Sequence, residues 1–227
     1  MKIGILGTGM VGQVLGGKLA ELGHDVEIGT RDVQQTLALT EPNAYGMPAF
    51  STWQKENPMV KLGNYAHAAQ HGEVVLNATN GTGSLAALQQ AGENNLNGKI
   101  LVDIANPLDF SQGNRPRLSV SNDDSLGEQI QRAFPQVKVV KTLNTVTAFL
   151  MVNPGLIANG EHSLFICGND ENAKERVTGW LKQWFGWRDV IDLGDISGAR
   201  GMEMYLPIWL RLWGKLGTGM FNVKVVK

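Results

Sequence analysis

The feature that most constrains this chain is a glycine motif that directly follows a short apolar run. Residues 2–6 are typical of a strand, and Gly7-Thr8-Gly9-Met10-Val11-Gly12 follow with the spacing G-x-G-x-x-G. Each glycine has a separate role: the first permits a tight turn, the second lets the backbone approach a pyrophosphate, and the third lets a helix pack against the strand. Residues 13–22 then carry apolar side chains at helical spacing. The pattern predicts a dinucleotide site with its phosphates at a helix N-terminus.

Short apolar runs alternate with helical patterns along most of the chain, which indicates βα units and a parallel sheet. We expect strands at residues 2–6, 25–29, 60–62, 74–78, 100–104, 137–142, 164–167 and 190–193, and helices near 10–22, 32–39, 64–71, 83–91, 125–133, 170–185 and 198–215. Six such units complete a doubly wound Rossmann sheet by about residue 145. The expected fold is therefore α/β, with a dinucleotide-binding domain over residues 1–150 and a small C-terminal α/β appendage over residues 151–227.

Composition excludes several other classes of protein. The 20 basic side chains balance 21 acidic ones, so the chain lacks the cationic surplus that a nucleic-acid binder needs. The longest apolar run, at residues 202–213, is too short for a membrane span and is interrupted by Glu203, Pro207 and Arg211. The single cysteine, Cys167, excludes an intrachain disulfide and fits a reducing compartment. We therefore expect a cytoplasmic protein without nucleic-acid or membrane partners.

The end of the second expected strand indicates which dinucleotide is bound. A carboxylate there usually holds the free 2′-hydroxyl of NAD, whereas a 2′-phosphate requires an arginine and hydroxyl groups. Thr30 stands in the place of the carboxylate, and Arg31 follows with a guanidinium suited to phosphate. Asp32 is an alternative ribose ligand, but it is better placed as the N-cap of the next helix. These residues favour NADP over NAD.

Three later strands also end in small or polar residues. Ala78 and Thr79 end the strand at 74–78, Asn106 follows the strand at 100–104, and Asn144, Thr145 and Val146 follow the strand at 137–142. Because the carboxyl ends of parallel strands meet at one edge of a sheet, these residues are candidates for lining the cofactor. Turn chemistry alone also favours asparagine and threonine, so each asparagine is equally a turn former.

Five motifs, taken in order, resemble those of one family. They are Gly7–Gly12, Gly29–Asp32, Ala105-Asn106-Pro107-Leu108, Val140–Thr145, and Gly198-Ala199-Arg200 followed by Glu203 and Leu206-Pro207. With these motifs the chain resembles the coenzyme F420-dependent NADP oxidoreductases and the cytosolic oxidoreductase domain of the STEAP metalloreductases, across nearly its whole length. Family members often place a lysine shortly after the Ser/Thr-Arg pair, whereas this chain has Gln34 and Gln35.

The resemblance implies an N-terminal Rossmann domain that binds NADPH and exchanges a hydride with a flat deazaflavin, F420, or with a flavin. It implies that Thr8, Gly9, Met10 and Val11 line the pyrophosphate and that Thr30 and Arg31 bind the 2′-phosphate. It also places Ala78, Thr79, Asn106, Thr145 and Val146 along the path from adenosine to nicotinamide.

No group for proton transfer stands out, so we assign no catalytic residue. Hydride transfer between two planar rings needs orientation more than an acid or a base. His67 and His71 are four residues apart, but no carboxylate or cysteine beside them completes a metal site, so we expect no metal. Cys167 is expected to be a small buried hydrophobe. Lys141 would serve a third interpretation, reduction of an imine or a 2-hydroxy acid, although its place in a strand favours a structural role.

An apolar face marks the C-terminal helix, with Pro207 expected to kink it. Its apolar residues are Met202, Tyr205, Leu206, Trp209, Leu212 and Trp213. This face suits a protein core or a dimer interface, and Met202, Trp209 and Gly219 are alternatively the wall of a pocket for a second ring. Residues 221–225 alternate in polarity, which predicts a closing strand.

These patterns together predict an NADPH-dependent oxidoreductase that passes a hydride to a deazaflavin (F420) or flavin-like acceptor, with onward reduction of ferric iron as an additional expectation. The alternative is a regulatory protein that senses NADPH and binds a partner through its tryptophan-rich C-terminal face without turnover. The apolar C-terminal helix leads us to expect a homodimer.

Overall fold

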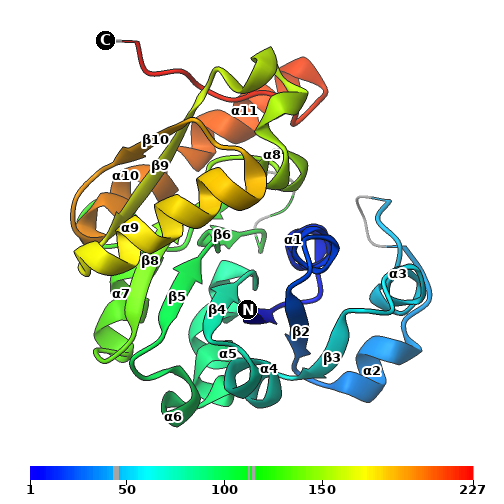
Figure 1. The fold of residues 1–227 in the computed structure, drawn as a ribbon. Helices are drawn as coiled ribbons and strands as arrows, with labels where there is room; N and C mark the ends of the chain where they lie inside the picture. The colour runs from blue at the N-terminus through cyan, green and yellow to red at the C-terminus, as the bar shows by residue number, and fades with distance from the viewer. Residues whose placement is uncertain (43–45, 112, 114–115, 227) are drawn as a thin grey trace.

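The computed structural model describes residues 1–42, 46–111, 113 and 116–226, and a sheet of eight strands forms its centre. The strands lie side by side in the order β10-β9-β8-β5-β4-β1-β2-β3 (Figure 1). Their bounds are β1 Lys2–Leu6, β2 Asp25–Thr30, β3 Lys61–Asn64, β4 Val74–Asn77, β5 Ile100–Asp103, β8 Lys138–Thr142, β9 Ser163–Gly168 and β10 Asp189–Asp192. Each of the eight strands expected between residues 2 and 193 is present, with ends displaced by at most two residues.

Six of these strands, β1 to β5 and β8, are parallel and lie in the order of a doubly wound Rossmann sheet. The predicted α/β fold is therefore confirmed. β9 then pairs antiparallel with β8, and β10 pairs parallel with β9. The C-terminal part of the chain thus extends the same sheet, and the division of the chain at residue 150 stays a prediction.

Helices cover both faces of the sheet. One face is covered by α1 Met10–Glu21, α3 Phe50–Glu56, α8 Ala148–Val152, α9 Glu171–Trp180 and the π-helical turn η4 Leu181–Phe185; the other is covered by α4 Tyr65–His71, α5 Ser84–Ala91, α6 Glu93–Leu96, α7 Leu126–Ala133 and α10 Ala199–Met204. The remaining elements are α2 Val33–Ala38, α11 Leu206–Leu216, the small hairpin of β6 Leu108–Asp109 and β7 Arg117–Leu118, and the short turns η1 Gly81–Gly83, η2 Pro154–Leu156, η3 Ala158–Gly160 and η5 Ile196–Gly198. α2 and α3 lie at the β3 end of the sheet, whereas α10 and α11 lie at the β10 end (Figure 1).

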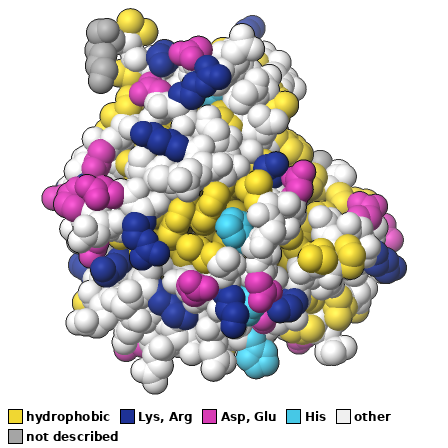
Figure 2. All heavy atoms as spheres, viewed as in Figure 1, with side chains coloured by type: hydrophobic (Ala, Val, Ile, Leu, Met, Phe, Trp, Pro, Cys, Tyr) yellow, Lys and Arg dark blue, Asp and Glu magenta, His cyan; other side chains and the backbone are white. Residues whose placement is uncertain are grey.

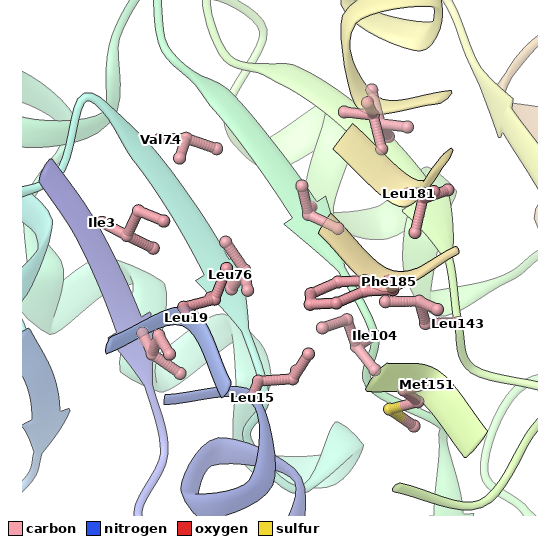
Figure 3. Close-up of a cluster of buried hydrophobic side chains, with 14 of the residues drawn as sticks. Ile3, Leu15, Leu19, Val74, Leu76, Ile104, Leu143, Met151, Leu181 and Phe185 are labelled. Carbon is pink, nitrogen blue, oxygen red and sulfur yellow. The ribbon is translucent and has the colours of Figure 1, made fainter. Parts of the chain in front are cut away.

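A hydrophobic core lies on each side of the sheet because parallel strands are apolar on both faces. Figure 3 shows the first core, in which Ile3 and Leu76 of the sheet face Leu15 and Leu19 of α1, and Phe185 of the π-helical turn closes the cluster. The second core contains Cys167 and the inward faces of α4, α5 and α7. Burial raises the pKa of the Cys167 thiol to about 12, as expected for a small buried hydrophobe.

The predicted helix at residues 198–215 is divided into α10 and α11 at Tyr205. Pro207 lies in the first turn of α11, where its missing N–H costs nothing but where its ring prevents the preceding helix from continuing. The predicted kink is therefore confirmed.

The predicted strand at residues 221–225 is wrong. The segment runs extended beside the first residue of β9, where Ser163 N–H donates to the carbonyl of Val223 at 2.9 Å. A second bond joins the Val225 N–H to the Ser163 hydroxyl rather than to a carbonyl, so no ladder forms. α3 and α8, in contrast, were not predicted at all.

The face of the molecule seen in Figure 2 carries hydrophobic side chains between α1 and α9, with acidic and basic side chains interspersed around them. No single-sign patch dominates this view, in agreement with the near-zero net charge. Over the described ranges, none of the helices has both the length and the apolar character that crossing a bilayer demands.

Candidate functional site

The glycine turn between β1 and α1 has the geometry that the motif predicts. Gly7 has φ +118°, and a Cβ there would lie 2.5 Å from the Ala78 carbonyl oxygen, so the first glycine allows both the turn and the contact with the β4 end. A Cβ at Gly12 would collide with the Gly7 carbonyl, so the third glycine allows α1 to pack closely. A Cβ at Gly9 would meet no described atom within 4 Å. The second glycine therefore faces open space, as a site for a pyrophosphate requires.

The N-terminus of α1 has no side-chain cap, and no acidic residue lies in its first turn. Side chains cap four other helices, α2, α4, α7 and α9, whereas α3, α5, α6, α8, α10 and α11 also lack such a cap, so the glycine turn before it, with Gly7 at positive φ and open space at Gly9, is what distinguishes α1. Uncapped N–H groups and the helix dipole together favour an anion at this end of α1. Asp32 is the cap of α2, as expected, because its carboxylate accepts from Gln35 N–H at 2.9 Å.

Gln13, in the first turn of α1, holds the preceding glycine loop in place through a hydrogen bond. Its Nε2 donates to the carbonyl of Thr8 at 3.0 Å, while its buried Oε1 has no partner among the described residues. The sequence analysis did not select Gln13. Its position immediately after the third glycine, as a polar residue on an otherwise apolar helix face, was the available signal.

Thr30 and Arg31 lie at the carboxyl end of β2, beside the glycine turn. The Thr36 hydroxyl donates to the Asp32 carbonyl at 2.8 Å, so the 2.8 Å bond between the Thr30 and Thr36 hydroxyls uses the proton of Thr30. Thr30 is 7% exposed, whereas Arg31 is exposed and forms no hydrogen bond or ion pair with the described residues. Arg31 therefore offers an unused guanidinium at this edge, and Thr30 shapes the turn.

The carboxyl ends of β4 and β5 are joined by a buried polar network. Asn77 Nδ2 donates to Asp103 Oδ1 at 2.8 Å, and Asn77 Oδ1 accepts from the Thr79 hydroxyl at 2.7 Å. The Thr79 hydroxyl also contacts the Ser84 hydroxyl at 2.7 Å. Thr79 is thereby held at the edge next to Ala78. Asn77, Ser84 and Asp103 were not selected from the sequence: Asn77 and Asp103 are the last residues of apolar strands, where residues are normally core, and Ser84 is the first residue of α5.

Asn106 and Asn144 connect the ends of β5 and β8. Asn106 Nδ2 donates to the Asn144 carbonyl at 2.8 Å, and Asn144 Nδ2 donates to Asn106 Oδ1 at 2.9 Å. The Asn144 Oδ1 and Thr145 Oγ1 atoms are buried without a partner among the described residues. Val146 is as buried as Asn144 and Thr145, but it is apolar and packs in the first core.

Lys141, at the end of β8, is fully buried in a cluster of charges. Its Nζ lies 2.8 Å from Asp103 Oδ2, 2.8 Å from Glu203 Oε1 and 2.5 Å from the Ala105 carbonyl oxygen. Burial by itself lowers the pKa of Lys141, but the two carboxylates more than offset that effect, so the pKa is raised. All three ammonium protons have acceptors, which leaves none for a substrate and favours the structural role expected for this lysine.

The C-terminal candidates approach the same edge. The Met202 carbonyl of α10 accepts from Asn144 Nδ2 at 3.2 Å, and Met202 is 2% exposed. Gly219 lies next to Trp209, since a Cβ there would be 3.6 Å from its ring, and Trp209 packs on Phe221 with ring centroids 5.4 Å apart. Trp209 Nε1 and the Tyr205 hydroxyl are buried without partners among the described residues.

The residues selected from the sequence therefore converge on one edge of the sheet from six segments. The test of whether they fit a dinucleotide rests on three observations: the uncapped N-terminus of α1, the open space at Gly9, and the orphaned polar atoms of Asn144 and Thr145. The residues fit the group. His67 and His71 are not part of this edge: His71 contacts the Asp25 carbonyl at 3.0 Å, and no described group of three His, Cys, Asp or Glu side chains is arranged to hold a metal.

Comparison with known proteins also indicates a dinucleotide-binding protein. Residues 2–107 match the family described as NADP oxidoreductase, coenzyme F420-dependent. The F420-dependent NADP reductase of Methanocaldococcus jannaschii is 31% identical over 225 residues, which is 97% of this chain and 97% of that protein. The metalloreductase STEAP3 of Rattus norvegicus is 29% identical over 97% of this chain, and the match spans 40% of that protein.

Solved structures agree. A crystal structure from Arthrobacter sp. FB24, provisionally assigned as an F420-dependent NADP-reductase, is 58% identical over 100% of both chains, with a TM-score of 0.95. An imine reductase from Myxococcus stipitatus in complex with NADP+ is 16% identical over 95% of this chain and 64% of that chain, with a TM-score of 0.63, which shows a shared fold only. Because the chain is 31% identical to the Methanocaldococcus jannaschii reductase over 97% of both proteins, it belongs to the coenzyme F420-dependent NADP oxidoreductases and is an NADP-dependent oxidoreductase.

Proposed function

We propose that this protein binds NADPH along the carboxyl edge of its parallel strands and passes a hydride to coenzyme F420. The observation that carries the cofactor part is the uncapped N-terminus of α1 beside the open space at Gly9. In this proposal the cofactor is bound by Gly7, Thr8, Gly9, Met10, Val11, Gly12, Thr30, Arg31, Ala78, Thr79, Asn106, Asn144, Thr145 and Val146. NADPH, when bound, supplies the hydride.

Each end of the cofactor is assigned to a different set of groups. The unpaired Arg31 guanidinium binds the 2′-phosphate, with Thr30 holding the turn through Thr36. The nicotinamide end forms hydrogen bonds with Asn144 Oδ1 and Thr145 Oγ1. Without a ligand these buried polar atoms have no partner among the described residues, which costs free energy. Residues 1–150 thus bind the cofactor, and residues 151–227 add the wall for the second substrate.

The acceptor wall consists of Met202, Trp209 and Gly219. Apolar and aromatic groups of this kind favour stacking of a flat ring, and the orphaned Trp209 N–H and Tyr205 hydroxyl supply hydrogen bonds to its polar rim. The hydride moves directly between two rings that the protein orients, and the proton that completes the reduced deazaflavin comes from solvent, so the transfer itself needs no acid or base from the protein. The relatives named as F420-dependent reductases support a deazaflavin as the acceptor.

Flavins and ferric iron are weaker candidates for the acceptor. A hydride carries two electrons and a ferric ion accepts one, so reduction of iron requires a flavin-like carrier between the two. The similarity to STEAP3 supports this route only at the level of the shared domain, because the match spans 40% of that protein. The alternative left open by the sequence, a regulatory protein that senses NADPH without turnover, is an outcome that the next experiment distinguishes from the proposed function.

One experiment separates these possibilities. Purified protein is mixed with NADPH and, in separate reactions, with F420, FMN, FAD or a ferric chelate, and loss of the reduced-nicotinamide absorbance is followed. We expect oxidation with F420 and little with the other acceptors. Tight NADPH binding without oxidation by any acceptor would show the sensor instead, and a faster reaction with a flavin would correct the acceptor.

The homodimer and the cytoplasmic location expected from the sequence are part of this proposal. α11 exposes Ile208 and Leu216 at 55% each, next to Trp213 at 39%. A second copy packed on this face would bury them. Sedimentation of the wild type against Ile208→Asp tests this: a monomeric wild type would contradict the dimer.

A further inference from the structure

Lys141, Asp103 and Asn77 form a row across three neighbouring strands. The register pairs Asn77 with Asp103 and Asp103 with Lys141, so the three side chains lie on the same face of the sheet at its carboxyl end. Asp103 links the row, accepting from Asn77 at 2.8 Å and from the Lys141 ammonium at 2.8 Å. Residues assigned to the cofactor edge follow each member of the row within three positions: Ala78 after Asn77, Asn106 after Asp103 and Asn144 after Lys141.

Glu203 brings the C-terminal helices to this row. It is 1% exposed, its Oε1 lies 2.8 Å from Lys141 Nζ, and it accepts the N–H groups of Leu126 and Gly127 at 2.9 and 3.1 Å. Those N–H groups belong to the first turn of α7, so the partial positive charge of the helix end also stabilises this carboxylate. One ammonium group thus connects β5, β8 and α10, and through Glu203 it reaches α7.

The consequence is geometric. The cofactor edge is tied to Lys141 through the Ala105 carbonyl, which precedes Asn106, while the acceptor wall is tied to it through Glu203, which follows Met202. We propose that Lys141 is a positioning residue whose buried ammonium group sets the separation between the cofactor edge and the acceptor wall. This inference rests on the proposed function for its catalytic consequence.

Hydride transfer is sensitive to this separation. Reacting atoms must approach to roughly 3–3.5 Å, and a misplacement of 1 Å costs about 100-fold in rate. Removal of the ammonium would leave two carboxylates, Asp103 and Glu203, buried without their shared counter-charge, and α10 would move away from the edge. The loss should therefore appear in the transfer step and hardly in the binding of NADPH, whose phosphate contacts lie on β1, β2 and α1.

A matched control exists in Lys174 of α9. It is 3% exposed and bonds two carboxylates, Asp192 at 2.8 Å and Glu171 at 2.9 Å, and a carbonyl, that of Gly194, at 3.1 Å. Lys174→Met therefore removes a similarly bonded buried ammonium away from the proposed site.

The experiment compares Lys141→Met, Lys174→Met and the wild type with NADPH and F420. We expect Lys141→Met to lower kcat by about 100-fold, to keep the Kd for NADPH within about twofold and to raise the isotope effect with 4-deuterated NADPH. Hydrogen exchange of the NADPH-bound protein should speed up at residues 199–216 in this variant alone. Lys174→Met should alter none of these readouts.

Two results would overturn the inference: transfer as fast in Lys141→Met as in Lys174→Met, or a loss of NADPH affinity that matches the loss of kcat. If Lys141→Met does not fold, Glu203→Gln replaces it, with the same expectations. If wild-type protein does not reduce F420 at all, the proposed function fails. Hydrogen exchange at residues 199–216 then decides the inference alone, and unchanged protection in Lys141→Met would contradict it.

Discussion

Asn106 and Asn144 bond to each other in both directions, with Asn106 Nδ2 2.8 Å from the Asn144 carbonyl oxygen and Asn144 Nδ2 2.9 Å from Asn106 Oδ1. The pair joins the ends of two adjacent strands at the proposed nicotinamide end of the site. Only the second of these bonds joins the two side chains, because Asn106 Nδ2 donates to the main-chain carbonyl of Asn144; loss of either side chain breaks that shared bond.

We therefore predict strong non-additivity in a double-mutant cycle of Asn106→Ala and Asn144→Ala. The coupling energy for unfolding should be about 1 kcal/mol, as for side chains in one hydrogen-bond network. Chemical denaturation of the four proteins measures it. Additive losses would mean that the two asparagines act only as separate turn formers.

Arg31 should decide between the two dinucleotides. Arg31→Ala removes a charge-assisted contact to the 2′-phosphate, so the KM for NADPH should rise about 10- to 100-fold while the KM for NADH stays unchanged. Gln34→Ala, an exposed neighbour in α2, is the control and should alter neither value. Equal effects of Arg31→Ala on both cofactors would contradict the assignment.

The second and third glycines of the motif should fail in different ways. Gly9→Ala meets no described atom within 4 Å, so its thermal stability should match wild type while its affinity for NADPH falls roughly tenfold or more. Gly12→Ala collides with the Gly7 carbonyl and should lose about 1–3 kcal/mol of stability without any ligand. Calorimetry with and without NADPH distinguishes them; destabilised apo Gly9→Ala protein would refute the reading of this space as a ligand site.

Glu128 should make stability depend on pH at the join between α7 and α10. Hydrogen bonds from Arg200, at 2.8 and 2.6 Å, hold the pKa of Glu128 below its ordinary 4.5. A lowered folded-state pKa contributes stability that is present above the ordinary value and is lost as pH falls through the folded value. Glu128→Gln should therefore remove this part of the loss of stability in acid. Chemical denaturation of both proteins at pH 7 and below pH 4.5 measures the free energy of unfolding that decides this.

The control for that measurement is Glu161→Gln, which breaks an exposed pair with Arg188 whose side chains are 62% and 66% exposed. It should leave the loss of stability in acid unchanged, because exposed ion pairs contribute little to the free energy of unfolding. An equal loss of stability in acid for Glu128→Gln and wild type would show that the Arg200 contact does not stabilise the folded protein.

The sheet was predictable because its strands are apolar runs bounded by clear turn residues, and the glycine turn because its conformation leaves few alternatives. α3 and α8 were not predictable in the same way. The N-cap residue of α3 is Ala49, and that of α8, which covers only five residues, is Thr147; neither forms the side-chain cap that would indicate the start of a helix. The extended residues 221–225 follow a strand pattern but meet β9 only at Ser163, beyond the three residues that β8 pairs.

The geometry of the candidate site was predictable where local chemistry defines it, as at the open turn of Gly9 and the exposed Arg31. The buried network was not, because Asp103, Lys141 and Glu203 are charges that only the tertiary fold brings together. A lysine within an apolar strand was the available signal, and a carboxylate on a neighbouring strand and another 62 residues later could not be paired with it from spacing alone.

Transfer of deuterium from 4-deuterated NADPH to oxidised F420 in ordinary water is the most direct test of the central claim. Mass spectrometry of the reduced F420 should show one deuterium when the label occupies the transferred position, since the hydride moves between the rings without exchange with solvent. Reduced F420 that carries only solvent hydrogen, or no reduction despite tight NADPH binding, would contradict the account.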